Sequence, residues 1–163
     1  MSTLASQRLL VVGASSGIGR ACAVSAAAAG ARVALAARRS DRLGEAAREA
    51  GAGAIPLACD VTDPASCERA VAEAAAAFDG LDGLVYAAGI ARPTLLRDAA
   101  QSDWRAALDT NLIGASLITR AALPHLRASR GRAVYLSSIS SEDPIPRPAM
   151  GLYVVSTGTW ELW

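Results

Sequence analysis

The fold of this chain is decided by residues 9–19, which read Leu-Leu-Val-Val-Gly-Ala-Ser-Ser-Gly-Ile-Gly. A short apolar run ends in a turn that carries Gly13, Gly17 and Gly19, and an alanine-rich helical segment begins at Ile18. Glycine permits a tight turn and lets a ligand approach the backbone closely, and the start of a helix offers unpaired N–H groups to an anion. The order of strand, glycine turn and helix therefore predicts a phosphate-binding turn. The alternative interpretation is a tight connection that binds no ligand.

Length and composition are typical of one globular domain, which we expect to cover residues 1–163. Hydrophobic residues make up 52% of the chain and aromatic residues only 4%, so small aliphatic side chains must fill the core. The net charge of +1 argues against binding to nucleic acid or to a membrane surface, and no apolar run is long enough to span a bilayer. The three cysteines lack the spacing of metal ligands, so we expect reduced thiols in a cytoplasmic protein and no metal site.

Apolar periodicity alternates between strand-like and helix-like segments along the chain. The predicted strands cover residues 9–13, 32–37, 54–58, 83–87 and 132–137, and the predicted helices cover residues 17–29, 41–50, 64–78 and 103–128. The strands are continuous apolar runs, as expected for strands that are covered on both faces. Strands that alternate with helices predict βαβ units with right-handed crossovers, and therefore a doubly wound α/β fold with a parallel sheet. Asp63 followed by Pro64 predicts a helix start.

Two arginines, Arg38 and Arg39, directly follow the second predicted strand. In a dinucleotide-binding fold this position lies beside the adenosine ribose, where an acid binds the 2′-hydroxyl of NAD and an arginine accommodates the 2′-phosphate of NADP. The nearest acid, Asp41, comes later and is expected to cap the next helix. The pair therefore favours NADP(H) over NAD(H). The alternative is two solvated arginines at the start of a helix.

Six short motifs along the chain match the pattern of one protein family. They are Gly13-Ala14-Ser15-Ser16-Gly17-Ile18-Gly19, Cys59-Asp60-Val61, Tyr86-Ala87-Ala88-Gly89, Asp109-Thr110-Asn111-Leu112, Ser137-Ser138 and Tyr153. On these motifs, the chain from about residue 8 to residue 156 resembles the short-chain dehydrogenase/reductase (SDR) family, which are Rossmann-fold oxidoreductases that use NAD(P). Three positions depart from the family pattern, because Val12 stands in place of its threonine and Tyr86-Ala87 in place of its two asparagines.

The resemblance implies a sheet order of 3-2-1-4-5 and NADP(H)-dependent reduction of a carbonyl or oxidation of an alcohol. It also implies that Tyr153 exchanges the proton, that Ser138 hydrogen-bonds the substrate oxygen, and that Asn111 organises the proton relay. Alternatively, Asn111 is a structural kink in a helix whose amide bonds the backbone, and Asp60 is merely a polar strand end. The residues implied to contact the cofactor are Gly13, Ser15, Ser16, Gly17, Ile18, Gly19, Arg38, Arg39, Asp60, Val61, Ala88 and Gly89.

The family pattern breaks after Tyr153. The family reads Tyr-x-x-x-Lys, whereas this chain has Thr157 at the lysine position and contains no lysine at all. A nearby ammonium favours the tyrosinate form, so its loss predicts slow turnover. The chain ends at Trp163, where the family continues for many tens of residues, so the resemblance implies that the C-terminal part of the family fold is missing.

Two features indicate self-association. The fifth predicted strand would form an open sheet edge, and the apolar tail at residues 160–163 has no evident partner. We therefore expect a homo-oligomer or a self-associating chain that acts on a small carbonyl or alcohol. The alternatives to an active enzyme are a catalytically impaired dinucleotide-binding or subunit-interaction protein and a truncated derivative of a full-length reductase.

Overall fold

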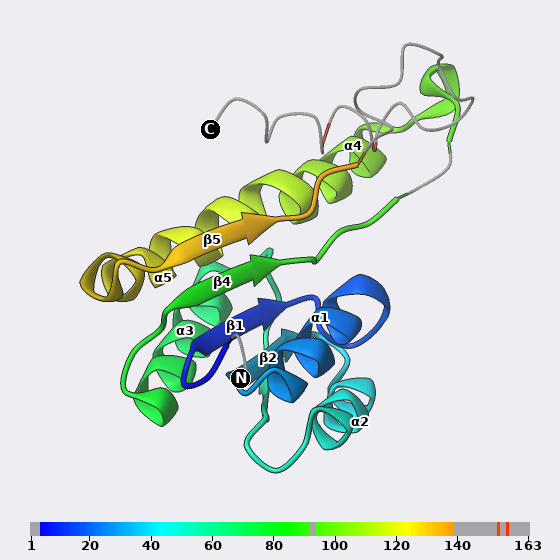
Figure 1. Ribbon diagram of the computed structural model, residues 1–163. Helices are drawn as coiled ribbons and strands as arrows, with labels where there is room; N and C mark the ends of the chain where they lie inside the picture. Colours follow the sequence, from blue (N-terminus) through cyan, green and yellow to red (C-terminus); the bar gives the residue numbers. More distant parts are fainter. Residues whose placement is uncertain (1–3, 92–93, 139–152, 154–155, 157–163) are drawn as a thin grey trace.

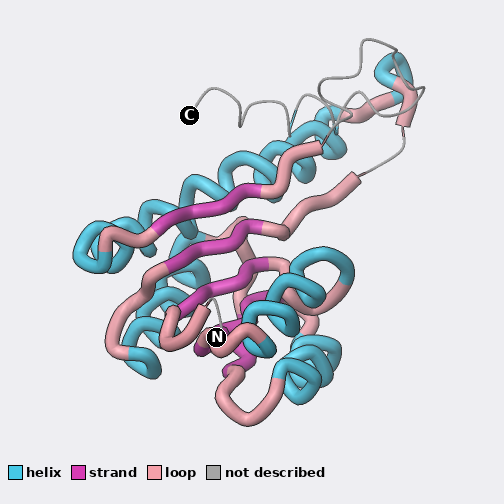
Figure 2. The backbone as a smooth tube through the Cα atoms, viewed as in Figure 1, coloured by secondary structure: helices cyan, strands magenta, loops and turns pink. Residues whose placement is uncertain are grey.

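The computed structural model describes residues 4–91, 94–138, 153 and 156. Within them, five parallel strands form one sheet with the order β3-β2-β1-β4-β5, and helices cover both of its faces (Figures 1 and 2). The strands are β1 (Arg8–Val12), β2 (Arg32–Ala37), β3 (Ile55–Ala58), β4 (Gly83–Tyr86) and β5 (Arg132–Tyr135). The predicted α/β class and the predicted sheet order are both confirmed.

The helices alternate with the strands as the sequence predicts, and element ends differ from the predicted ones by no more than two residues. The helical segments are α1 (Gly17–Ala28), α2 (Ser40–Ala50), α3 (Pro64–Phe78), η1 (Leu96–Asp98), α4 (Gln101–Leu108), η2 (Asp109–Ile113) and α5 (Gly114–Ser129). In the part of the chain that the structure describes, none of the helices combines the length and the apolar character that crossing a membrane requires.

Two hydrophobic cores lie on opposite faces of the sheet, because alternate residues of each strand point to opposite sides. Val11 of β1 packs with α1 and α2, whereas Leu10 and Val12 pack with α3 and α5. All three of these β1 residues have no exposed surface. Burial on both faces explains why the strands are continuous apolar runs in the sequence.

The start of α3 confirms one predicted cap, and the start of α2 corrects another. The Asp63 carboxylate accepts a hydrogen bond of 3.0 Å from the N–H of Ala65, with Pro64 in the first turn. In α2, however, Arg39 is the N-cap and Asp41 lies inside the first turn, so Asp41 is not the predicted cap. Its charge still lies at the positive end of the helix dipole, which is favourable.

The predicted helix at 103–128 is a single helical run interrupted by a wider turn. Residues Asp109–Ile113 form a π-helical segment, η2, between α4 and α5. Single π turns inside α-helices are frequent at functional sites. Here the wider turn carries Asn111, so the alternative of a helix irregularity at this residue describes its backbone correctly.

Candidate functional site

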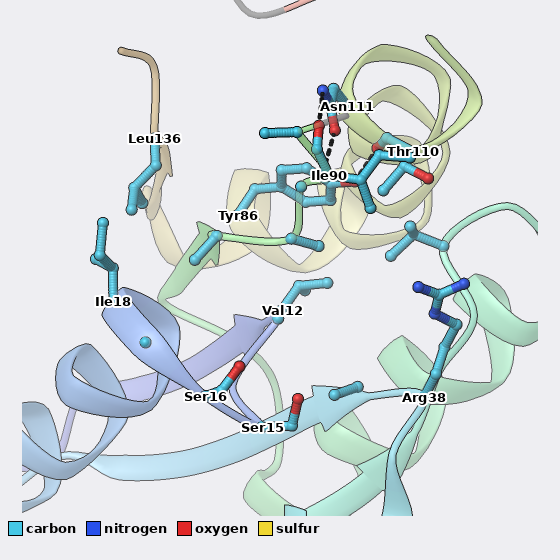
Figure 3. A pocket seen from close by; sticks show the side chains of 18 of the residues that line it. Val12, Ser15, Ser16, Ile18, Arg38, Tyr86, Ile90, Thr110, Asn111 and Leu136 are labelled. Atoms are coloured by element: carbon cyan, nitrogen blue, oxygen red, sulfur yellow. Dashed lines mark hydrogen bonds between the residues drawn. The ribbon is translucent and has the colours of Figure 1, made fainter. Parts of the chain in front are cut away.

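The carboxyl ends of β1, β2 and β4 meet at one edge of the sheet, where a cleft of about 800 Å³ opens (Figure 3). In doubly wound sheets this edge is where ligands bind. Twelve of the predicted site residues line the cleft: Gly13, Ser15, Ser16, Gly17, Ile18, Arg38, Arg39, Val61, Ala88, Gly89, Asn111 and Tyr153. The fold thus gathers most of the predicted residues around one space, although they come from separate parts of the chain.

The glycine turn lies at one wall of this cleft. Gly13 has φ +85°, and a Cβ there would lie 2.5 Å from the backbone nitrogen of Ala88, so only glycine fits between β1 and the segment after β4. Gly17 has φ +57°, and a Cβ there would meet nothing within 4 Å. The first turn of α1 therefore presents bare backbone to open space, which is the form of an anion-binding helix start.

Gly19, which the resemblance implies to contact the cofactor, is not among the residues that line the cleft and is closely packed. A Cβ at this position would lie 2.5 Å from the carbonyl oxygen of Gly13 and 3.2 Å from the Cβ of Ala87. The missing side chain lets α1 pack closely against the turn. This is the role of the third glycine in dinucleotide-binding turns.

Two guanidinium groups lie at the end of β2, where the sequence places them. Arg39 donates hydrogen bonds from Nη2 to the hydroxyl oxygens of Ser15 (3.0 Å) and Ser16 (2.8 Å), which joins β2 to the glycine turn. Arg38 extends its side chain toward the cleft (Figure 3). The cleft is therefore positively charged next to the helix start that would hold a phosphate.

Asp60 does not line the cleft, although its neighbour Val61 does. Its carboxylate accepts hydrogen bonds from the backbone N–H (3.0 Å) and the hydroxyl (2.9 Å) of Thr62. Burial opposes ionisation of this carboxyl, but these two hydrogen bonds and the nearby charge of Arg38 outweigh it and lower its pKa. The contacts match the alternative of a polar strand end that shapes the turn before α3.

Asn111 lies at the opposite end of the cleft and is 3% exposed. Its Oδ1 accepts a hydrogen bond from the N–H of Ile90 (2.8 Å), and its Nδ2 donates to the carbonyl of Ile90 (3.0 Å) and to Oγ of Ser156 (2.7 Å). In Figure 3, dashed lines mark the hydrogen bonds between Asn111 and Ile90. One side chain therefore connects η2, the segment after β4 and Ser156.

Ser156 belongs to this network and was not predicted from the sequence. It has no exposed surface, and its hydroxyl donates a hydrogen bond of 3.0 Å to the carbonyl of Tyr153. The available signal was its spacing, because a residue three positions after Tyr153 lies on the same side of a helix. Tyr153 itself lines the cleft.

The serine pair lies directly after β5. Ser137 lines the cleft, whereas Ser138, the predicted catalytic serine, does not. Thr157, at the motif lysine position, and the apolar tail at residues 160–163 lie outside the described residues. Among the residues that are described, no three His, Cys, Asp or Glu side chains are placed to hold a metal ion.

Known proteins share both the sequence pattern and the fold. The family model of the short chain dehydrogenases matches residues 7–156. The 11-beta-hydroxysteroid dehydrogenase-like 2 of Arabidopsis thaliana is 38% identical over 153 residues, which are 91% of this chain and 49% of that protein. Serine 3-dehydrogenase of Agrobacterium fabrum is 36% identical over 137 residues, which are 83% of this chain and 55% of that protein.

A solved structure agrees closely with the fold described above. The short chain dehydrogenase from Burkholderia cenocepacia J2315, crystallised in complex with NADP, superposes with a TM-score of 0.91 and 36% identity, covering 98% of this chain and 66% of that one. The chain spans about half the length of the curated relatives it matches. With its glycine turn, its sheet order and a family match over nearly its whole length, the chain belongs to the short-chain dehydrogenase family.

Proposed function

We propose that this chain forms the NADP(H)-binding part and much of the catalytic wall of an oxidoreductase that reduces a carbonyl or oxidises an alcohol. The observation that carries the proposal is the single cleft, which has the glycine turn and two arginines at one end and Asn111 and Tyr153 at the other. The two curated relatives described above are named for different compounds, so we propose a class of reaction and not a particular substrate.

The residues present fit a dinucleotide. The backbone at Gly17 is open to the cleft, and α1 begins there, so the diphosphate has N–H donors and a favourable helix dipole. Arg38 and Arg39 would hold the 2′-phosphate, because a guanidinium group offers paired donors to phosphate oxygens. The hydroxyls of Ser15 and Ser16 already contact Arg39 and keep it at this end of the cleft.

At the other end, the side chains have the chemistry that a hydride transfer requires. When bound, a reduced nicotinamide supplies the hydride. Tyr153 would donate the proton to the substrate oxygen, and a serine of the Ser137-Ser138 pair would hydrogen-bond that oxygen. Asn111 is linked to the backbone carbonyl of Tyr153 through the hydroxyl of Ser156. Because Thr157 brings no positive charge to Tyr153, we propose that turnover is slow.

Comparing the binding of NADPH and NADH tests the cofactor proposal. In Arg38→Ala, NADPH should bind about tenfold more weakly, because charge-assisted hydrogen bonds to a phosphate are lost. NADH, which lacks that phosphate, should bind almost as before. Arg42→Ala is the matched control, since Arg42 is exposed on α2 and does not line the cleft. Equal weakening of both cofactors would refute the assignment.

The second candidate function is dinucleotide binding without catalysis, which the threonine at position 157 favours. Thr157→Lys would place an ammonium four residues after Tyr153 and should raise the rate of NADPH oxidation with small ketones. We expect a slight increase, because substrate positioning contributes separately to the rate. Brisk turnover by the unmodified chain, abolished in Tyr153→Phe, would contradict the argument from the missing charge.

A further inference from the structure

Tyr86, the last residue of β4, occupies the position where the family pattern has an asparagine. Its side chain is 2% exposed, and its hydroxyl donates a hydrogen bond to the backbone carbonyl of Thr110 in η2. Figure 3 shows the ring extending from the strand to this turn. Burial, reinforced by the nearby thiols of Cys67 and Cys59, raises the pKa of Tyr86. The hydroxyl therefore remains protonated and able to donate throughout the physiological pH range.

The helix passes unusually close to this hydroxyl. A Cβ at Gly114, the first residue of α5, would lie 2.9 Å from Oη of Tyr86 and 2.8 Å from Cγ2 of Val61. Only a glycine allows this approach, so the backbone and the tyrosine fit each other at the junction between η2 and α5. The hydroxyl is thus held between β4 and the turn that carries Asn111.

Thr110 and Asn111, which are neighbours in η2, form hydrogen bonds with β4 and with the segment that follows it. Thr110 is bound by Tyr86 at the end of β4, and Asn111 binds both backbone groups of Ile90, four residues further along. Asn111 then reaches Ser156 and, through it, the carbonyl of Tyr153. The position of the Asn111 side chain at the cleft wall therefore depends on where η2 lies relative to β4.

We propose that Tyr86 is a positioning residue whose hydroxyl, through the Thr110 carbonyl, fixes η2 and so holds Asn111 at the wall of the cleft. This inference rests on the proposed function, because the wall matters only if the cleft holds a dinucleotide. The aromatic ring stays in Tyr86→Phe, so the substitution removes the hydrogen bond and keeps the packing.

The neighbouring strand provides a matched control. Tyr135 of β5 is the register partner of Tyr86, and its hydroxyl forms a hydrogen bond of 2.8 Å with Oγ1 of Thr119 in α5. It too connects a strand to this helical run, but Tyr135 does not line the cleft. Tyr135→Phe therefore removes a similar hydroxyl from the same layer without releasing η2.

The experiment compares two ligands that fill different lengths of the cleft. NADPH spans both ends, whereas 2′,5′-ADP carries only the adenosine part and should remain at the arginine end. We expect Tyr86→Phe to weaken NADPH at least about fivefold, as the loss of one buried hydrogen bond permits, and to leave 2′,5′-ADP within about twofold. Tyr135→Phe should change neither ligand. Equal weakening of both ligands by Tyr86→Phe, no weakening of either, or the same pattern in Tyr135→Phe would overturn the proposal.

Hydrogen exchange separates this inference from the proposed function. In Tyr86→Phe the amides of residues 109–114 should exchange faster than in the unmodified chain, while those of α3 should not change. If the unmodified chain binds neither NADPH nor 2′,5′-ADP, the proposed function fails, and the role of Tyr86 in binding falls with it. If both ligands bind but exchange in residues 109–114 is unaffected by the substitution, the positioning role alone is overturned.

Discussion

The two ends of the cleft are built in different ways. The arginine end consists of the glycine turn and the end of β2, and its shape comes from backbone conformation and the absence of side chains. The Asn111 end is assembled from three distant segments by side-chain hydrogen bonds. The arginine end should therefore be sensitive to added atoms, whereas the Asn111 end should be sensitive to the removal of polar groups.

Physical chemistry supports this difference. An added Cβ at Gly13 or Gly19 meets backbone, which cannot move aside without disturbing the packing around the turn. A removed amide at Asn111 leaves buried backbone groups without partners, and such groups cost more than the hydrogen bond contributed. Among the described residues, no buried side-chain nitrogen or oxygen lacks a partner. The network is thus complete in the part of the chain that is described.

Gly13→Ala should have the largest effect on stability. The new Cβ would lie 2.5 Å from the Ala88 nitrogen at φ +85°, and the clash together with the unfavourable backbone should cost about 3 kcal/mol. Urea unfolding measures the loss. Gly17→Ala is the control, because its Cβ would meet nothing within 4 Å; it should cost about 1 kcal/mol yet still weaken NADPH. Similar unfolding midpoints for the two variants would contradict the distinction.

Asn111→Ala should destabilise the chain by about 2 kcal/mol, because the Ile90 backbone and Ser156 lose their partner. Combining it with Ser156→Ala tests whether the network acts as a unit. The free-energy changes should fall short of additivity by about 1 kcal/mol, as for residues in direct contact. Strict additivity in urea unfolding would show that the two side chains act independently.

A pair outside both ends offers a check on stability alone. Arg8 and Asp82 form a two-pronged ion pair at the start of β1 and β4, with atoms 2.6 Å and 2.8 Å apart. The hydrogen bond from Arg8, aided by its charge, lowers the pKa of Asp82. A depressed carboxyl pKa gives stability above the unfolded value of about 3.9, and this stability is lost as the pH falls through the folded value.

Asp82→Asn should therefore lower the urea midpoint at pH 7, and its effect should shrink as the pH falls, because the unmodified chain then loses the same charge. Binding of NADPH at pH 7, measured well below the unfolding midpoint, should not change, because neither residue lines the cleft. A loss of NADPH affinity would show that the whole sheet, and not its carboxyl edge, determines binding.

We expect the smallest effect from a substitution in β5, the outer strand of the described sheet. Val134 of β5 is 55% exposed, and β5 is the edge of the described sheet. We propose that this surface mediates self-association of the chain. Light scattering over a dilution series should show more than one copy at high concentration, and Val134→Glu should shift the balance toward the monomer. A chain that stays monomeric at all concentrations would contradict this proposal.

The arginine end could be predicted from the sequence because its residues are consecutive and their conformations are local. Gly13, Gly17 and the arginine pair follow directly from strand and helix periodicity, and the structure places all of them at the cleft. Gly19 and Asp60 were assigned to the cofactor, but their surroundings show packing and turn formation, which depend on Ala87 and Thr62. Local sequence patterns do not distinguish a residue that lines the cleft from one that packs behind the lining residues.

For the Asn111 end, the sequence predicts which residues belong to the site but not how they are arranged. The apolar helical run does not indicate a π turn, and the Tyr86 hydroxyl that donates to the Thr110 carbonyl in this turn comes from another strand. Ser156 could be identified only from its hydrogen bond with Asn111, a residue 45 positions earlier. Of the serine pair, Ser137 lines the cleft, and the apolar pattern of the preceding strand does not indicate which of the two serines does so.

The close contact among Gly13, Gly19 and the Ala87-Ala88 segment also has an evolutionary consequence. A side chain at position 13 would displace the backbone at 88, and one at position 19 would meet both residue 13 and the methyl group of Ala87. Drift at any one of these sites is therefore limited by the others, and an alignment of related chains should show them small together. Gly17 is under no such steric limit, but its φ of +57° still favours glycine, so position 17 should vary only toward residues such as asparagine that tolerate this conformation.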